Sequence, residues 1–135
     1  MSDASPANKL GPPRQLREQE RAIVEKLVSG TPSEKRILGQ LQECLVRDMA
    51  DGGMGSIQFC KHSSQERTFG QQIAEGSFHD ADGVLVSVTL NVDQDGDLFE
   101  LDLWKVDFSP LIRYPDLEDL AIIQRDERGN VIAAE

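Results

Sequence analysis

The sequence predicts an α+β fold in which an N-terminal helical hairpin packs on an antiparallel sheet of about four to five strands. In the first third of the chain the apolar residues recur at helical spacing. Between residues 84 and 106 they alternate with polar residues, as they do in strands that have one buried face. Helical segments therefore precede strand segments, and this order is typical of α+β domains. A chain of 135 residues suits one such domain.

Three parts of the chain are expected: a disordered leader at 1–13, a single α+β domain at 14–120 and a loosely ordered C-terminal tail at 121–135. The leader ends in Gly11-Pro12-Pro13, which keeps it out of the first helix. It lacks the apolar stretch of a secretory signal, and nowhere do about 18 apolar residues run together to span a membrane. Cys44 and Cys60 are isolated, as cysteines in cytosolic proteins usually are. We therefore expect a cytoplasmic protein that contacts no membrane.

Two helices joined by a short turn are expected first. Residues 14–29 form the first helix, with Gly30 placed as its C-terminal stop. Thr31 can cap the second helix, and Glu34 stands at the spacing of a capping box. Each helix has an apolar face: Leu16, Ile23, Val24, Leu27 and Val28 in the first, and Ile37, Leu38, Leu41 and Leu45 in the second.

The segments that follow the helices are shorter. Residues 45–49 either end the second helix or form a strand, and residues 56–60 alternate as a strand. Residues 67–78 have a mixed pattern of apolar and polar residues, and bulges or bends are expected at Gly70 and Gly76.

The clearest pattern is a β-hairpin at 84–106 with a turn at Asp95-Gly96, a dipeptide that type I′ turns prefer. This turn gives each strand one apolar and one polar face, and a shift of one residue would destroy both faces. The apolar pairs are Val88–Leu103, Leu90–Leu101 and Val92–Phe99; the polar pairs are Asn91–Glu100 and Thr89–Asp102, followed by Ser87–Trp104.

One half of the chain carries the whole net charge of −10. Residues 1–79 hold ten acids and ten bases, whereas residues 80–135 hold fourteen acids and four bases. A surface this negative repels phosphates, so we expect no direct nucleic-acid partner. Basic proteins and divalent cations are the partners that this charge would attract, and solubility alone is the simpler explanation.

The hairpin turn also resembles a calcium-binding loop. From Asn91 to Asp102, oxygen-bearing side chains occupy positions of EF-hand ligands, with Asp93, Asp95 and Asp97 among them. An EF-hand needs a helix on each side, whereas both flanks here alternate as strands. We therefore interpret the segment as a hairpin turn and keep a cation site at Asp93, Asp95 and Asp97 as the alternative.

Glu100, Asp102 and Trp104 fall together on the polar face of one strand. Paired carboxylates can act as acid and base, or they can simply be solvated. An exposed Trp beside them would be a typical anchor of a protein interface, whereas a Trp covered by a helix or a bend of the sheet would belong to the core. Both interpretations of Trp104 stay open at this stage.

No catalytic constellation is found. His62 and His79 are the only histidines, and neither stands in a motif with a nucleophile and an orienting group. The glycine-rich segment 51–56 lacks the lysine of a phosphate-binding loop, so we expect a turn there, with backbone-mediated binding as the alternative. We predict no catalytic residue and no cofactor, and favour a non-enzymatic protein.

Residues 48–57 (DMADGGMGSI) and 98–111 (LFELDLWKVDFSPL), together with Asn91-Val92-Asp93, resemble an uncharacterised bacterial family of small single-domain proteins. The likeness extends over about residues 14–120. It implies no catalytic residue, because no activity is established for that family. The Glu100-x-Asp102-x-Trp104 pattern is also similar to strands of many immunity proteins from bacterial toxin systems.

The sequence thus favours a binding protein, and the second resemblance implies an immunity-type inhibitor of a basic protein. The expected contact residues are Glu100, Asp102 and Trp104, flanked by Asn91 and Asp93. One alternative is a module, or an enzyme, that binds a small ligand or a divalent cation through the acidic hairpin. The other is a structural or dimerising domain, since the sequence leaves the oligomeric state open.

Overall fold

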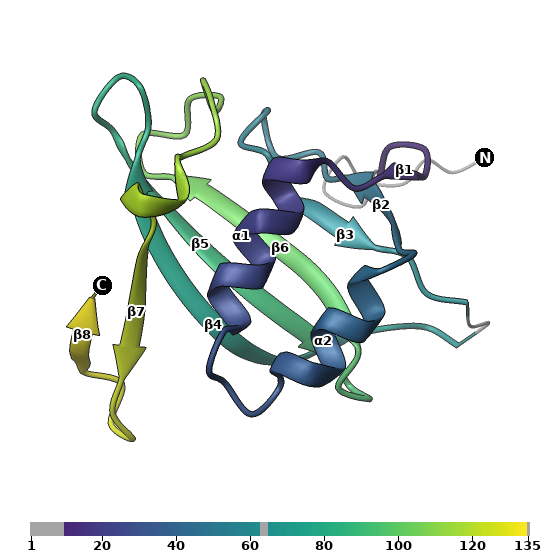
Figure 1. Ribbon diagram of the computed structural model, residues 1–135. Helices are drawn as coiled ribbons and strands as arrows, with labels where there is room; N and C mark the ends of the chain where they lie inside the picture. Colours follow the sequence, from purple (N-terminus) through teal and green to yellow (C-terminus); the bar gives the residue numbers. More distant parts are fainter. Residues whose placement is uncertain (1–9, 63–64, 135) are drawn as a thin grey trace.

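The computed structural model describes residues 10–62 and 65–134 and has two layers, a twisted sheet and a pair of helices on one of its faces (Figure 1). The helices are α1 (Glu18–Val28) and α2 (Glu34–Leu41). The strands are β1 (Arg14–Gln15), β2 (Leu45–Asp48), β3 (Ile57–Phe59), β4 (Phe69–His79), β5 (Leu85–Asp93), β6 (Leu98–Lys105), β7 (Ala121–Arg125) and β8 (Val131–Ala134). Leu117–Asp119 forms a short 3-10 helix before β7.

The strands form one sheet of eight strands in the order β1-β2-β3-β6-β5-β4-β7-β8, and every neighbouring pair is antiparallel. The α+β class is confirmed, but the expected count of four to five strands is wrong. The additional strands lie at the two edges of the sheet. β1 has two residues and pairs with β2, while β7 and β8 occupy residues for which the sequence indicates a loose tail. β1 depends on a partner distant in sequence, whereas β7 and β8 pair with each other across a short turn. All three segments are too short to show a clear strand periodicity.

The hydrophobic core lies between the helices and the inner face of the sheet, which we define as the face covered by α1 and α2. The residues buried there come from both layers: Ile23, Val24, Leu27, Val28, Ile37 and Leu41 from the helices, and Ile57, Phe78, Val86, Val88, Leu90, Leu101 and Leu103 from the strands. The opposite face, here called the outer face, is covered by neither helix (Figure 1). Because strand residues alternate between faces, the side chains between these core residues point to the outer face.

The register of the central hairpin is confirmed over most of its length. Val88 lies opposite Leu103 and Leu90 lies opposite Leu101, as the alternation predicts. The pairing differs near the turn, where a bulge between Asn91 and Val92 sets Val92 opposite Leu98. Leu98 therefore joins the core in place of Phe99. Phe99 instead lies under the guanidinium of Arg67, 4.8 Å from the ring centroid.

The first helix is shorter than expected. It begins at Glu18 because Arg14 and Gln15 pair with β2 instead. Most of the predicted disordered leader, residues 1–9, lies outside the described residues; of the remainder, Gly11 donates its backbone N–H to the carbonyl of Asp48 at 2.8 Å. In the described part of the chain, neither helix has the length and apolar character needed to cross a membrane.

Candidate functional site

The outer face of β5 and β6 carries most of the residues that the sequence singles out. Alternation along β6 places Glu100, Asp102 and Trp104 on this face, and Asn91 of β5 lies opposite Glu100. The Asn91 amide donates a hydrogen bond from Nδ2 to Oδ2 of Asp102 at 3.0 Å. The structure thus brings together four of the five residues expected to contact a partner.

Asp102 is a half-buried carboxyl group that has no cation beside it. Burial raises the pKa of Asp102 to about 6, and the nearby carboxyl groups of Glu100 and Asp51 act in the same direction. The hydrogen bond from Asn91 opposes this shift. Within residues 10–62 and 65–134, no Lys or Arg side chain contacts Asp102. At neutral pH its negative charge therefore forms at a free-energy cost that a cation from outside the chain would offset.

Trp104 and Phe108 form an exposed aromatic pair where β6 ends. Their ring centroids are 5.9 Å apart and the ring planes are tilted by 58°. Trp104 is 48% exposed and Phe108 69% exposed, so Trp104 is a surface residue and not part of the core. Leu85 and Val106, whose backbones are hydrogen-bonded, are exposed as well. An apolar area of this kind at the end of a carboxylate-bearing strand is typical of interaction surfaces.

The backbone of Phe108 is strained. Its φ is +64°, and it is the one non-glycine residue with a positive φ in the part of the chain that the structure describes. A bulky side chain avoids this region, at a cost on the order of 1 kcal/mol. The N–H of Phe108 donates to the carbonyl of Lys105 at 2.8 Å, and Oδ1 of Asp107 accepts from the backbone N–H and the hydroxyl of Ser109. These bonds hold the turn that places the Phe108 ring beside Trp104.

A buried ion pair ties this turn to the rest of the domain. The ammonium of Lys105 contacts Asp80 at 2.8 Å and Asp82 at 2.7 Å. Asp80 also accepts the backbone N–H of Ile112 at 2.8 Å, so it contacts the chain on both sides of Phe108. Burial alone would raise the pKa of Asp80, but Lys105 and the backbone N–H groups that it accepts lower it to about 2.

Sequence reasoning missed both Phe108 and its support. The spacing of Trp104, Val106 and Phe108 was the available signal for an exposed row of apolar side chains. No local signal pairs Lys105 with Asp80, because the two residues meet only once the sheet has formed.

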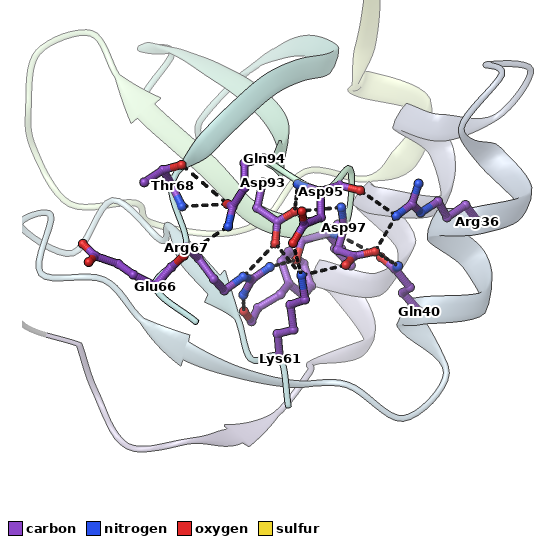
Figure 2. Close-up of polar contacts among 12 residues, drawn as sticks. Arg36, Gln40, Lys61, Glu66, Arg67, Thr68, Asp93, Gln94, Asp95 and Asp97 are labelled. Carbon is purple, nitrogen blue, oxygen red and sulfur yellow. Dashed lines mark hydrogen bonds and ion pairs between the residues drawn. The ribbon is translucent and has the colours of Figure 1, made fainter. Parts of the chain in front are cut away.

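The turn of the hairpin holds a second group of acids, the turn cluster (Asp93, Asp95 and Asp97). One oxygen from each carboxylate lies within 4.8 Å of the others, as in a cation site. The ammonium of Lys61 contacts these three side chains at 3.1, 3.2 and 2.8 Å, respectively (Figure 2). A positive charge supplied by the chain itself therefore stands where a bound cation would.

Two guanidinium groups complete the turn cluster. Nε of Arg67 contacts Asp93 at 2.9 Å, and Nη2 of Arg36 contacts Asp97 at 2.7 Å (Figure 2). Burial alone would raise the pKa of Asp93, but hydrogen bonds from the N–H of Asp97 and from Arg67 and Lys61 lower it to about 2. Asp93, which the sequence places next to the contact residues, is instead buried in this network.

A cleft of about 710 Å³ lies where residues 48–56 meet residues 111–116. It includes neither Glu100 nor Asp102. In its glycine-rich wall, the Asp51 carboxylate accepts the backbone N–H groups of Met54 and Ser56 at 3.1 and 2.9 Å. These amides of the loop are therefore satisfied from within, as in the turn that the sequence predicts, and are not offered to a phosphate.

A family model described as "Domain of unknown function (DUF6984)" matches residues 13–115. Because the match covers most of the chain, the chain belongs to this family. The matched range contains both sequence blocks, the outer-face residues and the Phe108 turn, and it ends before β7 and β8. No curated protein and no solved structure matches the chain.

Proposed function

We propose that this member of the DUF6984 family is a non-enzymatic binding domain that holds a basic segment of another protein against the outer face of its sheet. The observation that carries the proposal is Asp102, a half-buried carboxyl group that no Lys or Arg in the described part of the chain contacts, on the same strand face as the exposed Trp104. A Lys or Arg side chain of the partner would pair with Asp102 and Glu100. Its apolar stem or its guanidinium would cover Trp104 and Phe108.

The charge distribution supports a basic partner. The half of the chain that contains the outer-face carboxylates has fourteen acids and four bases. Attraction between opposite charges speeds association and excludes acidic competitors, while a large aromatic side chain such as Trp104 supplies affinity when it is covered. A basic toxin held by an inhibitor of the immunity type would meet these requirements, so we propose toxins as the first class of partner to test.

The alternative of a divalent cation in the turn cluster has less support. An ion there would have to displace the ammonium of Lys61, which already contacts all three carboxylates. Together with Arg67 and Arg36, Lys61 supplies three positive charges to three carboxylates. The electrostatic gain from a bound ion would therefore be small.

An enzyme acting through Glu100 and Asp102 also has less support. A raised pKa such as that of Asp102 suits a general acid, but catalysis also needs a concave site that encloses a substrate. Neither carboxylate lines the cleft described above. A broad partner that covers an open sheet face fits this arrangement better than a small substrate does.

The test compares two variants that lose the same charge. Glu100→Gln/Asp102→Asn removes two negative charges from the outer face, and Glu118→Gln/Asp119→Asn removes two from an exposed segment elsewhere. Each immobilised protein is incubated with a lysate of the source organism, and retained proteins are quantified by mass spectrometry. We expect a basic protein that wild type and the control variant retain and that the outer-face variant loses.

The partner identified in this way is then titrated calorimetrically. We expect Trp104→Ala to raise its Kd by at least about tenfold. Equal loss of the partner from both double variants would indicate general electrostatic attraction, and retention by both would place the binding surface elsewhere; either result contradicts the proposal.

A further inference from the structure

The two edges of the sheet differ in how they are protected. An edge strand exposes N–H and C=O groups that can pair with another chain, and proteins block such edges with charges, prolines or very short strands. At one edge, β1 has only two residues and directly follows Pro12 and Pro13. Its Arg14 is held by Glu20 and Asp48 at 2.7 and 2.8 Å. This edge is therefore poorly suited to further pairing.

β8 at the other edge is short as well, but it lacks the other two protections, charges and prolines. Its four residues, Val131–Ala134, include no charged residue and no proline. Val131 is 52% exposed and Ile132 63% exposed. β8 is last in the strand order, so in the described chain it pairs with β7 on one side only. Its second side is a short apolar edge that is open to another strand.

The β7–β8 hairpin also projects from the domain. Only Ala121 and Ile122 of β7 have backbone pairing with β4; the rest of β7 pairs with β8, and the Arg125 side chain binds Glu75 of β4 at 2.7 Å. Figure 1 shows the hairpin at the left, beyond the edge of β4 and away from both helices. A strand could therefore approach β8 without meeting the body of the domain.

The hairpin is electrically neutral within an acidic protein. Residues 121–134 contain two acids and two bases: Asp126, Glu127, Arg125 and Arg128. A basic partner would gain little here and would be drawn to the outer face instead. A neutral apolar strand fits this edge best, and two copies of the chain that meet along it keep their acidic outer faces out of contact with each other.

We propose that two copies of this chain associate through β8, with the two β8 strands antiparallel about a two-fold axis. Identical strands pair in this way through self-complementary contacts. The pairing sets Val131 opposite Ala134 of the partner subunit and Ile132 opposite Ala133 of the partner subunit. Four residues make a small interface, so the dimer is reversible with a Kd on the order of 100 µM. The two outer faces take no part in the pairing.

The experiment is sedimentation equilibrium of the full chain from about 10 µM to about 1 mM. The average mass is expected to rise toward that of a dimer, and added salt should not weaken association because it screens the net repulsion. Ile132→Lys puts a charge on the edge and Ala133→Pro adds a proline to it; each should raise the dimer Kd at least about tenfold. The matched control is Ile112→Lys, at a residue that is 58% exposed outside the hairpin, and it should leave the Kd unchanged.

A protein that stays monomeric over the whole range overturns the proposal. So does a dimer that survives Ile132→Lys, or one that Trp104→Ala weakens as much as Ile132→Lys does. Circular dichroism shows whether each variant is folded, and Ile132→Lys alone decides if Ala133→Pro is not. Because the basic partner is proposed to bind the outer face, each proposal can fail while the other stands.

Discussion

The β5–β6 hairpin carries two groups of acids whose surroundings are opposite. In the turn cluster, Lys61, Arg67 and Arg36 contact the carboxylates, and the pKa of Asp93 falls to about 2. On the outer face, a few residues further along the same hairpin, no Lys or Arg of the described residues contacts Asp102, and its pKa rises to about 6. One group is neutralised by its own chain, and the other is left negative and partly desolvated.

This contrast shows that an acidic side chain is not always available to bind a partner. In the sequence both groups look alike, and the turn cluster even looks more like a binding site because it resembles a calcium loop. The difference arises from three bases distant in sequence that reach the turn and not the outer face. A half-buried acid whose cation is missing from its own chain is therefore the better candidate for contact with a partner.

The largest effect is expected from Asp93→Ala. It removes the buried carboxylate that holds Arg67 and Lys61 and that accepts the N–H groups of Asp95 and Asp97. Arg67 then lacks its carboxylate, while Lys61 keeps Asp95 and Asp97, and the free energy of unfolding should fall by about 3 kcal/mol in urea denaturation. Asp95→Ala is the matched control: among the described residues, Lys61 is the one cation that pairs with this exposed carboxylate, and the loss should stay below about 1 kcal/mol. Similar losses in the two variants would contradict the structural role of the turn cluster.

Asp102→Asn should raise the free energy of unfolding, whereas Asp93→Ala should lower it. The pKa of Asp102 is about 6 in the folded protein and near 3.8 in the unfolded chain, so between these values the folded state binds the extra proton. Its contribution therefore favours folding at about pH 4 and is lost as the pH rises through about 6. Asn mimics the neutral acid and should stabilise the protein by about 1 kcal/mol at pH 7.5, a figure reduced for solvent screening of this half-exposed group, with little change at pH 4.

Urea denaturation at both pH values measures this effect, with Glu118→Gln as a variant that removes one exposed acid elsewhere. A loss of stability at pH 7.5, or a gain that is equal at both pH values, would show that the charge of Asp102 is compensated in the folded protein.

The smallest effect is expected from Lys61→Gln in the presence of calcium. Removing the ammonium leaves three carboxylate oxygens within 4.8 Å of one another without their central positive charge. The variant should bind Ca²⁺ weakly, with a Kd on the order of 1 mM, seen as chemical-shift changes confined to residues 93–97. Wild type should show no such changes at the same calcium concentration. Calcium-dependent shifts in wild type would instead support the cation-binding alternative.

The central hairpin could be predicted from the sequence because its determinants are local. Alternation between Val88 and Leu103 defines both faces. The turn lies at Asp95-Gly96 as expected, but it is not of type I′, because Gly96 has a positive φ and Asp95 does not. The bulge near the turn could not be predicted in the same way. Phe99 leaves the core where Arg67, from a polar segment before β4, covers its ring and binds the Leu98 carbonyl.

The residues of the candidate site also fall into two groups, those that a local sequence pattern predicts and those that depend on distant contacts. Alternation was enough to place Glu100, Asp102 and Trp104 on one face. The burial of Asp93 depends on bases that no local pattern brings to it. The exposed position of Phe108 depends on a turn that the Lys105–Asp80 pair anchors, and that pair exists only in the folded sheet. Strands β1, β7 and β8, at the two ends of the sheet, were missed because they are short and show no clear strand periodicity.

The left-handed backbone of Phe108 subjects this position to two opposing selection pressures. Glycine adopts such a φ freely, so Phe108→Gly would relax the turn while removing the ring that lies against Trp104. A library sorted for thermal stability alone should enrich glycine here, whereas one sorted for capture of a basic partner should keep an aromatic residue. The outcome of such competing selections at a single codon would report whether evolution has kept this turn for recognition at the expense of stability.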